Sequence, residues 1–273
     1  MKNFHIYWFS GTGNTLHLAE FAKKILCQHE CKVTIHQISP ELPSPELTQN
    51  DCLIIMFPVY GQGAPPFVWQ WCRKLPQTDT ILPVVVIDNM ANCSGMVKAP
   101  FYRLLKLKGY TPLAIKELKM PGNYFFTSSQ EKNRIIIKKG ELELEQFLNA
   151  LLEDKATWPH RPAFIAWFHL FTGIFFQLFA RIIGKCFILK KSCTKCKQCI
   201  TMCPVDNIYE KKDGSPGWKF HCEQCMRCIY YCPNKSITNL FKFICHRPMY
   251  RCENIATNKL KKESVKRRDE AIK

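Results

Sequence analysis

Two cysteine runs of identical spacing constrain this chain more than any other feature of its sequence. Each run reads C-x2-C-x2-C-x3-C and is followed by proline. The offset of 29 residues between Cys193 and Cys222 also carries Pro204 onto Pro233. This self-similarity indicates a duplicated unit rather than two chance clusters. The eight cysteines are Cys193, Cys196, Cys199, Cys203, Cys222, Cys225, Cys228 and Cys232.

The spacing predicts two iron-sulfur cubanes that exchange one ligand. Three cysteines of a run lie on one tight turn and can bind one 4Fe-4S cluster, whereas the fourth faces away and ligates the other cluster. Residues 190–240 resemble the bacterial-type two-cluster ferredoxins in this respect, with all eight ligand positions present. One expected ligand set is Cys193, Cys196, Cys199 and Cys232. The other is Cys222, Cys225, Cys228 and Cys203.

Zinc and disulfides are the competing uses of so many cysteines. Zinc sites usually space their ligands as two well-separated C-x2-C pairs, which is not the pattern here. Disulfides need an oxidising compartment, and the first residues, MKNFHIYWFSGTGNT, show no signal-peptide pattern. We therefore expect a reducing, cytoplasmic location, with membrane association left open.

Length and charge divide the chain into two unequal parts. A chain of 273 residues suits two domains, and the cysteine-rich part is so small that its clusters must act as staples. The net charge of +17 splits into +3 for residues 1–155 and +14 for residues 156–273. A strongly basic surface attracts acidic partners, so we expect an acidic redox protein and rank nucleic acid last. The sequence does not indicate an oligomeric state.

The N-terminal part begins with a strand, a polar loop and a helix. Phe4 to Phe9 are apolar enough for a buried strand, and an apolar stripe along Leu16 to Gln28 predicts a helix. The loop between them can present backbone N-H groups and hydroxyls to a phosphate at the positive helix end. It has no lysine for a Walker A motif and no third glycine for a dinucleotide motif. The expected phosphate ligands are Ser10, Gly11, Thr12, Gly13, Asn14 and Thr15.

This loop, S-x-T-G-N-T, resembles the phosphate-binding loop of flavodoxins, a family that binds FMN. The resemblance covers residues 1 to about 150. It implies that the loops after the third and fourth strands flank the flavin ring, and that Tyr60 could stack on it or pack on nearby prolines instead. The expected ring-loop residues are Pro58, Val59, Tyr60, Gly61, Asn89, Asn92 and Gly95.

Alternating strands and helices predict the fold class of the N-terminal part. We expect an α/β, flavodoxin-like, doubly wound parallel sheet, followed by a small ferredoxin-like α+β two-cluster domain. Further strands are expected at 33–38, 51–57, 82–87 and 111–118, with helices at 67–75 and 101–108. The expected division is a flavodoxin-like FMN-binding domain (1–155), an apolar helical connector (156–190), a two-cluster domain (191–240) and a basic C-terminal extension (241–273).

The connector contains 18 uncharged residues, 163–180. Small and polar residues recur along it, which favours packing against protein as a cluster-covering helix. An interfacial membrane helix is the second interpretation and a transmembrane span the third. For residues 259–273, rich in lysine and arginine, a solvated tail is favoured.

Taken together, the two motifs resemble the fused flavodoxin-ferredoxin proteins of anaerobes. The resemblance implies low-potential electron transfer between two 4Fe-4S clusters and FMN within one chain, linking a one-electron donor to an acceptor. The alternative is a flavoenzyme that reduces a small substrate at FMN, with the clusters as its electron feed. Donor, acceptor, direction of flow and catalytic residues are not indicated.

Overall fold

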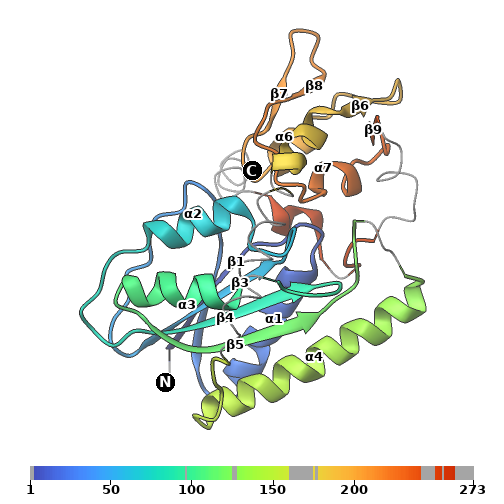
Figure 1. Cartoon of the computed structure of the whole chain (residues 1–273). Helices are drawn as coiled ribbons and strands as arrows, with labels where there is room; N and C mark the ends of the chain where they lie inside the picture. The colour runs from blue at the N-terminus through green and yellow to red at the C-terminus, as the bar shows by residue number, and fades with distance from the viewer. Residues whose placement is uncertain are drawn as a thin grey trace, which may run out of the picture.

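The computed structural model describes residues 3–95, 97–124, 128–159, 175, 178–240, 250–253 and 255–261. Its N-terminal part is built on a five-stranded parallel sheet in the order β2-β1-β3-β4-β5 (Figure 1). This is the flavodoxin-like strand order of doubly wound folds, so the fold class expected for this part is confirmed. The strands are β1 Asn3–Trp8, β2 Lys32–Gln37, β3 Asp51–Pro58, β4 Pro83–Met90 and β5 Thr111–Lys119.

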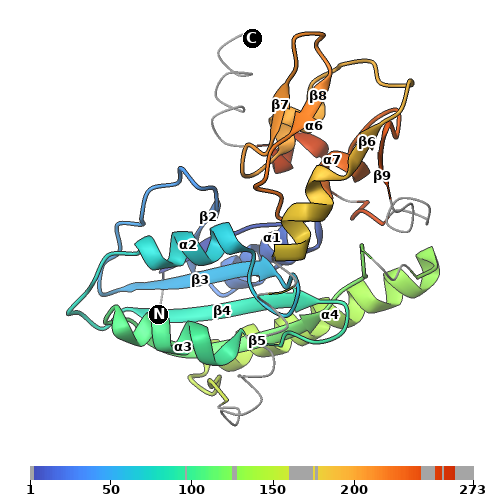
Figure 2. The ribbon, with the colours of Figure 1, turned by 45° about the horizontal axis from the view of Figure 1, so that its top comes forward.

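Helices cover both faces of this sheet (Figure 2). The central strand β3 is buried along its whole length, as expected for a parallel strand with helices on either side. The sheet has an apolar core on each face, and the side chains of β1 contribute to both. Ile6 packs in the core under α1 and α4, whereas Phe9, just beyond β1, packs in the core under α2 and α3. The helices are α1 Asn14–Gln28, α2 Pro66–Lys74, α3 Lys98–Leu107 and α4 Gln130–Leu152.

The strands and first three helices lie within a few residues of the ranges expected from sequence. Helix α4 is an addition that the sequence analysis does not predict. Ser129 caps it by accepting a hydrogen bond from the backbone N-H of Lys132, at 3.3 Å. Its apolar stripe is obscured by Ile135 and Leu142, which are exposed, so the pattern of its buried face is hard to read from sequence.

The C-terminal unit consists of short elements in two antiparallel pairs, β6 with β9 and β7 with β8 (Figure 1). The sequence repeat recurs in its backbone. Left-handed φ angles at Lys195, Lys197 and Asp206 return 29 residues later at Gln224, Met226 and Lys235. The elements are β6 Phe187–Leu189, α6 Gln198–Met202, β7 Ile208–Glu210, β8 Pro216–Trp218, α7 Arg227–Tyr230 and β9 Ile237–Asn239.

The connector can be described only in part. Residues 175 and 178–185 are helical, and residues 160–174, 176 and 177 lie outside the described residues. Ala180, Ile183 and Gly184 are buried, and a Cβ atom on Gly184 would lie within 2.8 Å of the Cys222 sulfur. The described end of the helix therefore covers the cysteine-rich unit. Within the part of the chain that the structure describes, no helix is both long and apolar enough to cross a bilayer.

Part of the C-terminal extension packs back on the N-terminal sheet domain. Its described residues, 250–253 and 255–261, include the short 3-10 helix η1, Thr257–Leu260. The backbone N-H of Cys252 donates to the carbonyl of Thr12 at 2.9 Å, and Leu260 is fully buried. The expectation of a solvated tail over residues 259–273 is thus wrong at the start of this range, because Leu260 is buried there.

Candidate cofactor sites

A cavity of about 280 Å³ opens at the carboxyl ends of β1, β3, β4 and β5. This is where doubly wound sheets hold their ligands. We call it the cofactor cavity. Of the thirteen residues expected from sequence, all but Gly13 and Gly95 line it. The eleven that do are Ser10, Gly11, Thr12, Asn14, Thr15, Pro58, Val59, Tyr60, Gly61, Asn89 and Asn92.

The loop before α1 has the features of an anion site. Thr12 and Thr15 are each at most 2% exposed, and the first turn of α1 contains no acidic residue. No side chain caps this helix, so its first N-H groups keep their hydrogen-bonding capacity at the positive end of the helix dipole. Gly13 does not line the cavity. It forms the turn instead, with a φ of 107° that favours glycine.

Hydrogen bonds join this loop to the loops that follow β4 and β5. Thr15 Oγ1 donates to Asn89 Oδ1 at 2.6 Å, and Asn123 Nδ2 donates to Thr12 Oγ1 at 2.6 Å. Asn14 Nδ2 donates to the carbonyl of Pro121 at 3.0 Å. The third loop, 121–124, is missing from the sequence prediction, although its Pro-Gly-Asn turn directly after the fifth strand could have indicated it.

Gly11 and Tyr60 form the floor between the cofactor cavity and the C-terminal unit. A Cβ atom on Gly11 would collide with the Tyr60 hydroxyl and would lie 2.6 Å from the carbonyl oxygen of Cys225. Glycine is therefore required for this close approach. The Tyr60 hydroxyl is buried and has no hydrogen-bond partner among the described residues, and burial raises its pKa well above the usual value. Gly95 lies outside the cavity, against Gln62.

The eight motif cysteines line two further cavities, in the crossed combination expected from sequence. The four cysteines Cys203, Cys222, Cys225 and Cys228 line what we call the proximal cysteine cavity. The distal cysteine cavity is lined by Cys193, Cys196, Cys199 and Cys232. Among the described residues, no three His, Cys, Asp or Glu side chains are grouped so that they could hold one metal ion.

Backbone N-H groups point at the cysteine sulfurs in the same way in both repeats. Asn207 N-H donates to Cys203 Sγ at 3.2 Å, and its counterpart Ser236 donates to Cys232 Sγ at 3.3 Å. Lys195 and Gln224 form a second matching pair, at 3.4 and 3.5 Å. Such donors favour a sulfur that carries negative charge.

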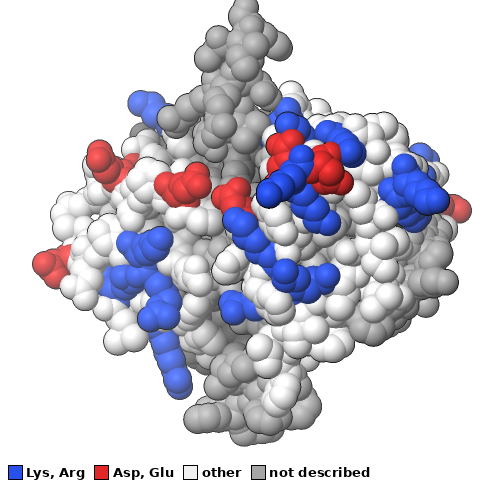
Figure 3. All heavy atoms as spheres, turned by 90° about the horizontal axis from the view of Figure 1, so that it is seen from above, with Lys and Arg blue, Asp and Glu red and all other residues white. Residues whose placement is uncertain are grey.

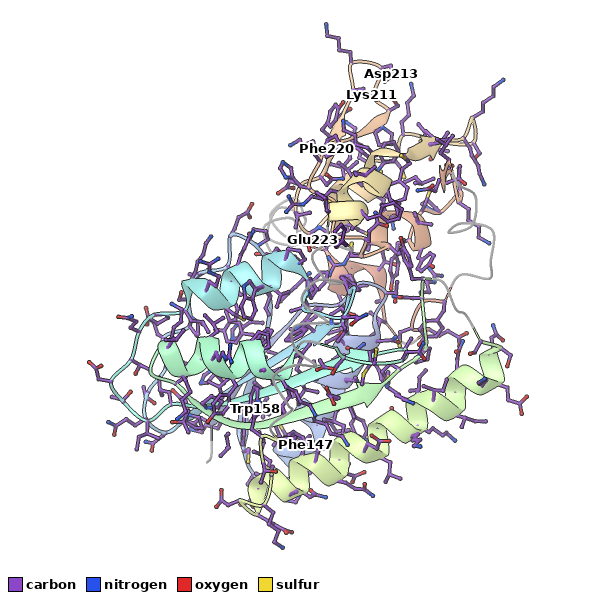
Figure 4. The ribbon with its side chains drawn as sticks, in the orientation of Figure 1. Phe147, Trp158, Lys211, Asp213, Phe220 and Glu223 are labelled. Atoms are coloured by element: carbon purple, nitrogen blue, oxygen red, sulfur yellow. The ribbon has the colours of Figure 1, made fainter. Side chains whose placement is uncertain are left out.

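Burial controls ionisation around the proximal cysteine cavity. Burial raises the pKa of Cys225 to about 11, and it raises the pKa values of Cys222 and Cys228 as well. The intervening Glu223 lies between the C-terminal unit and helix α2 (Figure 4). Burial raises its pKa to about 8, although Arg181 and the backbone N-H of Phe67 oppose the shift. A thiolate in this place therefore needs a compensating positive charge.

Gln224 contributes to both the cofactor cavity and the proximal cysteine cavity. Its Nε2 donates to the carbonyl of Ala180 at 2.8 Å and lies 3.4 Å from Cys222 Sγ. Its Oε1 accepts a hydrogen bond from the Tyr124 hydroxyl at 3.2 Å. Gln224 thus borders both cavities.

Arg227 is the main tie between the C-terminal unit and the loop before α1. It is completely buried, and its Nε and Nη2 both donate to the carbonyl of Ser10, at 2.9 and 2.6 Å. Its Nη1 donates to the carbonyl of Leu260 at 2.8 Å, and its guanidinium lies 4.9 Å from the ring centroid of Phe9. The sequence analysis missed this residue because nothing local distinguishes an arginine between two cysteines.

The repeat explains part of this arrangement. Gln198 is the counterpart of Arg227 in the first run, and it donates to the carbonyl of Tyr231 at 2.9 Å. Arg227 makes the reciprocal bond to the carbonyl of Met202, the counterpart of Tyr231, at 3.3 Å. Each repeat therefore donates an equivalent hydrogen bond to the other repeat. The arginine side chain is longer than glutamine, and only it also reaches the carbonyl of Ser10.

Comparison with known proteins gives structural neighbours only. No family model matches the sequence, and no curated protein matches it. A short-chain flavodoxin associated with a non-canonical PDU bacterial microcompartment is 19% identical, with a TM-score of 0.42, over 57% of this chain and 100% of its own. A putative quinone reductase from Klebsiella pneumoniae is 10% identical, with a TM-score of 0.41, over 59% of this chain and 88% of its own. Rubredoxin oxygen:oxidoreductase from Desulfovibrio gigas is 14% identical, with a TM-score of 0.34, over 56% of this chain and 37% of its own.

Proposed function

We propose that this chain is an electron-transfer protein that holds FMN in the cofactor cavity and one 4Fe-4S cluster in each cysteine cavity. The observation that carries the proposal is the shared position of Gln224, which makes the cofactor cavity and the proximal cysteine cavity neighbours. When bound, FMN supplies a two-electron carrier and each cluster supplies a one-electron carrier.

The residues of the cofactor cavity fit FMN. Thr12 and Thr15 with the N-terminus of α1 offer donors to a phosphate dianion without a competing carboxylate in the first turn. Tyr60 and the loops at 58–62 and 89–93 provide a flat, partly apolar wall for a flavin ring. The buried hydroxyl of Tyr60 provides an unsatisfied donor in that wall.

The residues of the cysteine cavities fit cubanes. Four cysteines drawn from both runs line each cavity, and each run directs backbone N-H groups at its own sulfurs. Apolar side chains shield the sulfurs from water. They are Ile200, Ile208, Ile229, Tyr230 and Ile237, all of them buried except Ile200, which is partly buried.

The three cavities are neighbours in the order distal, proximal, cofactor. Helices α6 and α7, which contain Cys199 of the distal cysteine cavity and Cys228 of the proximal one, contact each other. Gln224 then connects the proximal cysteine cavity to the cofactor cavity. This order supports a relay in which electrons cross the protein between a surface site and the flavin site.

The test is purification without oxygen, followed by measurement of iron, sulfide and flavin and by stepwise reduction in an optical cell. We expect eight irons and one FMN per chain, as two 4Fe-4S clusters and one flavin require. Zinc in place of iron, or a protein that cannot bind added FMN, would remove the proposal. Steady turnover of a defined small molecule at the flavin would instead establish the flavoenzyme alternative.

A further inference from the structure

We propose that the surface around the distal cysteine cavity is the docking site for an acidic one-electron carrier protein. This inference rests on the proposed function, because it concerns the outer end of the relay. The distal cysteine cavity is close to solvent, since Cys196 is exposed and Cys193, Cys199 and Cys232 are partly exposed. In the proximal cysteine cavity no cysteine is exposed, because Cys203 is only 7% exposed and the other three cysteines are partly exposed.

Five exposed lysines surround the distal cysteine cavity, and we call them the lysine ring. Lys195 and Lys197 line the cavity itself. Backbone hydrogen bonds hold two further lysines beside motif cysteines. The carbonyl of Lys190 accepts from the N-H of Cys193 at 3.2 Å, and the N-H of Lys235 donates to the carbonyl of Cys232 at 3.1 Å. The complete ring is Lys190, Lys191, Lys195, Lys197 and Lys235.

Little negative charge compensates the lysine ring. Lys197 pairs with Glu210 at 2.8 Å, and Lys195 Nζ donates to the backbone carbonyl of Asp213 at 2.5 Å. Within residues 178–240, Lys190, Lys191 and Lys235 form no ion pair. Figure 3 views this end of the molecule and shows basic side chains flanking the acidic ones, and Figure 4 places Lys211 and Asp213 at its tip.

Charge and position together indicate the kind of partner. Uncompensated lysines attract a carboxylate-rich surface and speed its encounter with this face. An anionic lipid or a nucleic acid would also be attracted, but neither brings a one-electron centre to the exposed Cys196. In each encounter one electron passes, so the partner is oxidised as this chain is reduced, or the reverse, and no bond is made or broken.

The experiment compares two reductants in stopped flow under anaerobic conditions. The first is a reduced acidic plant-type [2Fe-2S] ferredoxin, and the second is dithionite. The variant Lys190→Glu/Lys191→Glu/Lys235→Glu should react with the ferredoxin at least about tenfold more slowly and should lose most of the dependence on ionic strength. Its iron content and its reduction by dithionite should match the wild type.

A matched control variant reverses three charges elsewhere. Lys23 and Lys24 on α1 and Lys106 on α3 are exposed, and both helices belong to the sheet domain (Figure 1). Lys23→Glu/Lys24→Glu/Lys106→Glu should keep the wild-type rate with ferredoxin. Equal slowing in both variants would mean that only net charge matters, and would overturn the proposed docking site.

Two further outcomes separate this inference from the proposed function. Wild-type protein whose iron-sulfur centres dithionite cannot reduce would contradict the proposed function itself. Normal dithionite reduction with an unchanged ferredoxin rate in the lysine-ring variant would contradict the docking site alone. Loss of binding to phosphatidylserine vesicles in that variant, with unchanged ferredoxin kinetics, would assign the surface to lipid and would also overturn the inference.

Discussion

The N-terminal sheet domain and the C-terminal unit organise their cavities by different physical means. In the sheet domain, strands of six to nine residues pack in a continuous apolar core. The loops that line the cofactor cavity therefore begin at the ends of rigid strands. In the C-terminal unit the strands have three residues and the helices four or five. On the proposed function, a unit with so little regular structure would depend on bonds to its metal clusters for stability. The chain would then pair a preformed site with a site that its own cofactors complete.

Iron removal is the strongest way to test this difference. Treatment with a chelator under mild oxidation should unfold residues 187–240 and leave the sheet folded, because only the C-terminal unit relies on clusters. Hydrogen exchange with mass spectrometry should show complete loss of protection in β6 to β9 and retained protection in β1, β3 and β4. Retained protection in both regions would mean that the C-terminal unit is stable without its clusters.

Substitution in the phosphate loop should affect only the preformed site. Thr12→Val and Thr15→Val together remove two hydroxyls that face the cofactor cavity while keeping the side-chain shape. Each lost hydrogen bond to a charged group costs about 1.5 to 3 kcal/mol, so FMN affinity should fall by about 100-fold or more. Flavin fluorescence titration measures the affinity, and iron analysis should give an unchanged content. Thr80→Val, at an exposed position after α2, is the control. Loss of iron together with flavin would show that the two regions are not separate.

Arg227→Gln should weaken the link between the regions. Glutamine can keep the bond to the carbonyl of Met202, as Gln198 does in the other repeat, but it cannot span the distance to Ser10. The loop before α1 then loses a buried partner, and we expect FMN affinity to fall about tenfold with iron retained. Fluorescence titration of the anaerobic holoprotein provides the measurement. Gln198→Ala is the matched control, and it should leave FMN affinity unchanged. An equal loss in both variants would assign the effect to general loosening of the C-terminal unit.

Asp51 provides a smaller test that is confined to the sheet domain. Despite its burial, hydrogen bonds from Thr48, Asn3 and His5 lower its pKa to about 2. A carboxyl with a depressed folded-state pKa stabilises the fold above its unfolded pKa of about 3.9, and that contribution is lost as the pH falls toward 2. Protonation of Asp51 should lower the free energy of unfolding of the wild type by about 1 kcal/mol as the pH falls from 6 to 3. Exchange of β1 amides should show that Asp51→Asn lacks this part of the acid dependence, and an identical acid response in both proteins would contradict the assignment.

The sequence predicts local features of this protein well. The phosphate loop follows from six consecutive residues, and the crossed cysteine sets follow from spacing alone, because both depend on short-range backbone geometry. The ring loops could be placed because parallel strands end at a common edge. In each case a short motif or a general rule of the fold marks the residues.

Features that depend on distant contacts were not predictable. Gln224 and Arg227 acquire their roles from residues about 100 and 217 positions away, and no local pattern marks them. Tyr250 of the basic C-terminal extension donates to Asn14 at 2.8 Å. Leu260 anchors the start of the tail that was expected to be solvated, where the surrounding lysines hide it in the sequence. The exposed apolar residues Leu178, Phe179 and Ile182 show why the connector allowed both a covering and an interfacial interpretation.

The pairing of the Ser10 carbonyl with a guanidinium 217 residues further along the chain also sets an order of maturation. A nascent chain emerges from the ribosome with its amino end first, so the sheet can form while the later residues are still being synthesised. The loop before α1 can contact the buried Arg227, and Arg227 can bond to the anchoring Leu260, only after both residues have been synthesised. The loop before α1 therefore reaches its final packing late in the synthesis of each new molecule, after the cysteine-rich unit has emerged.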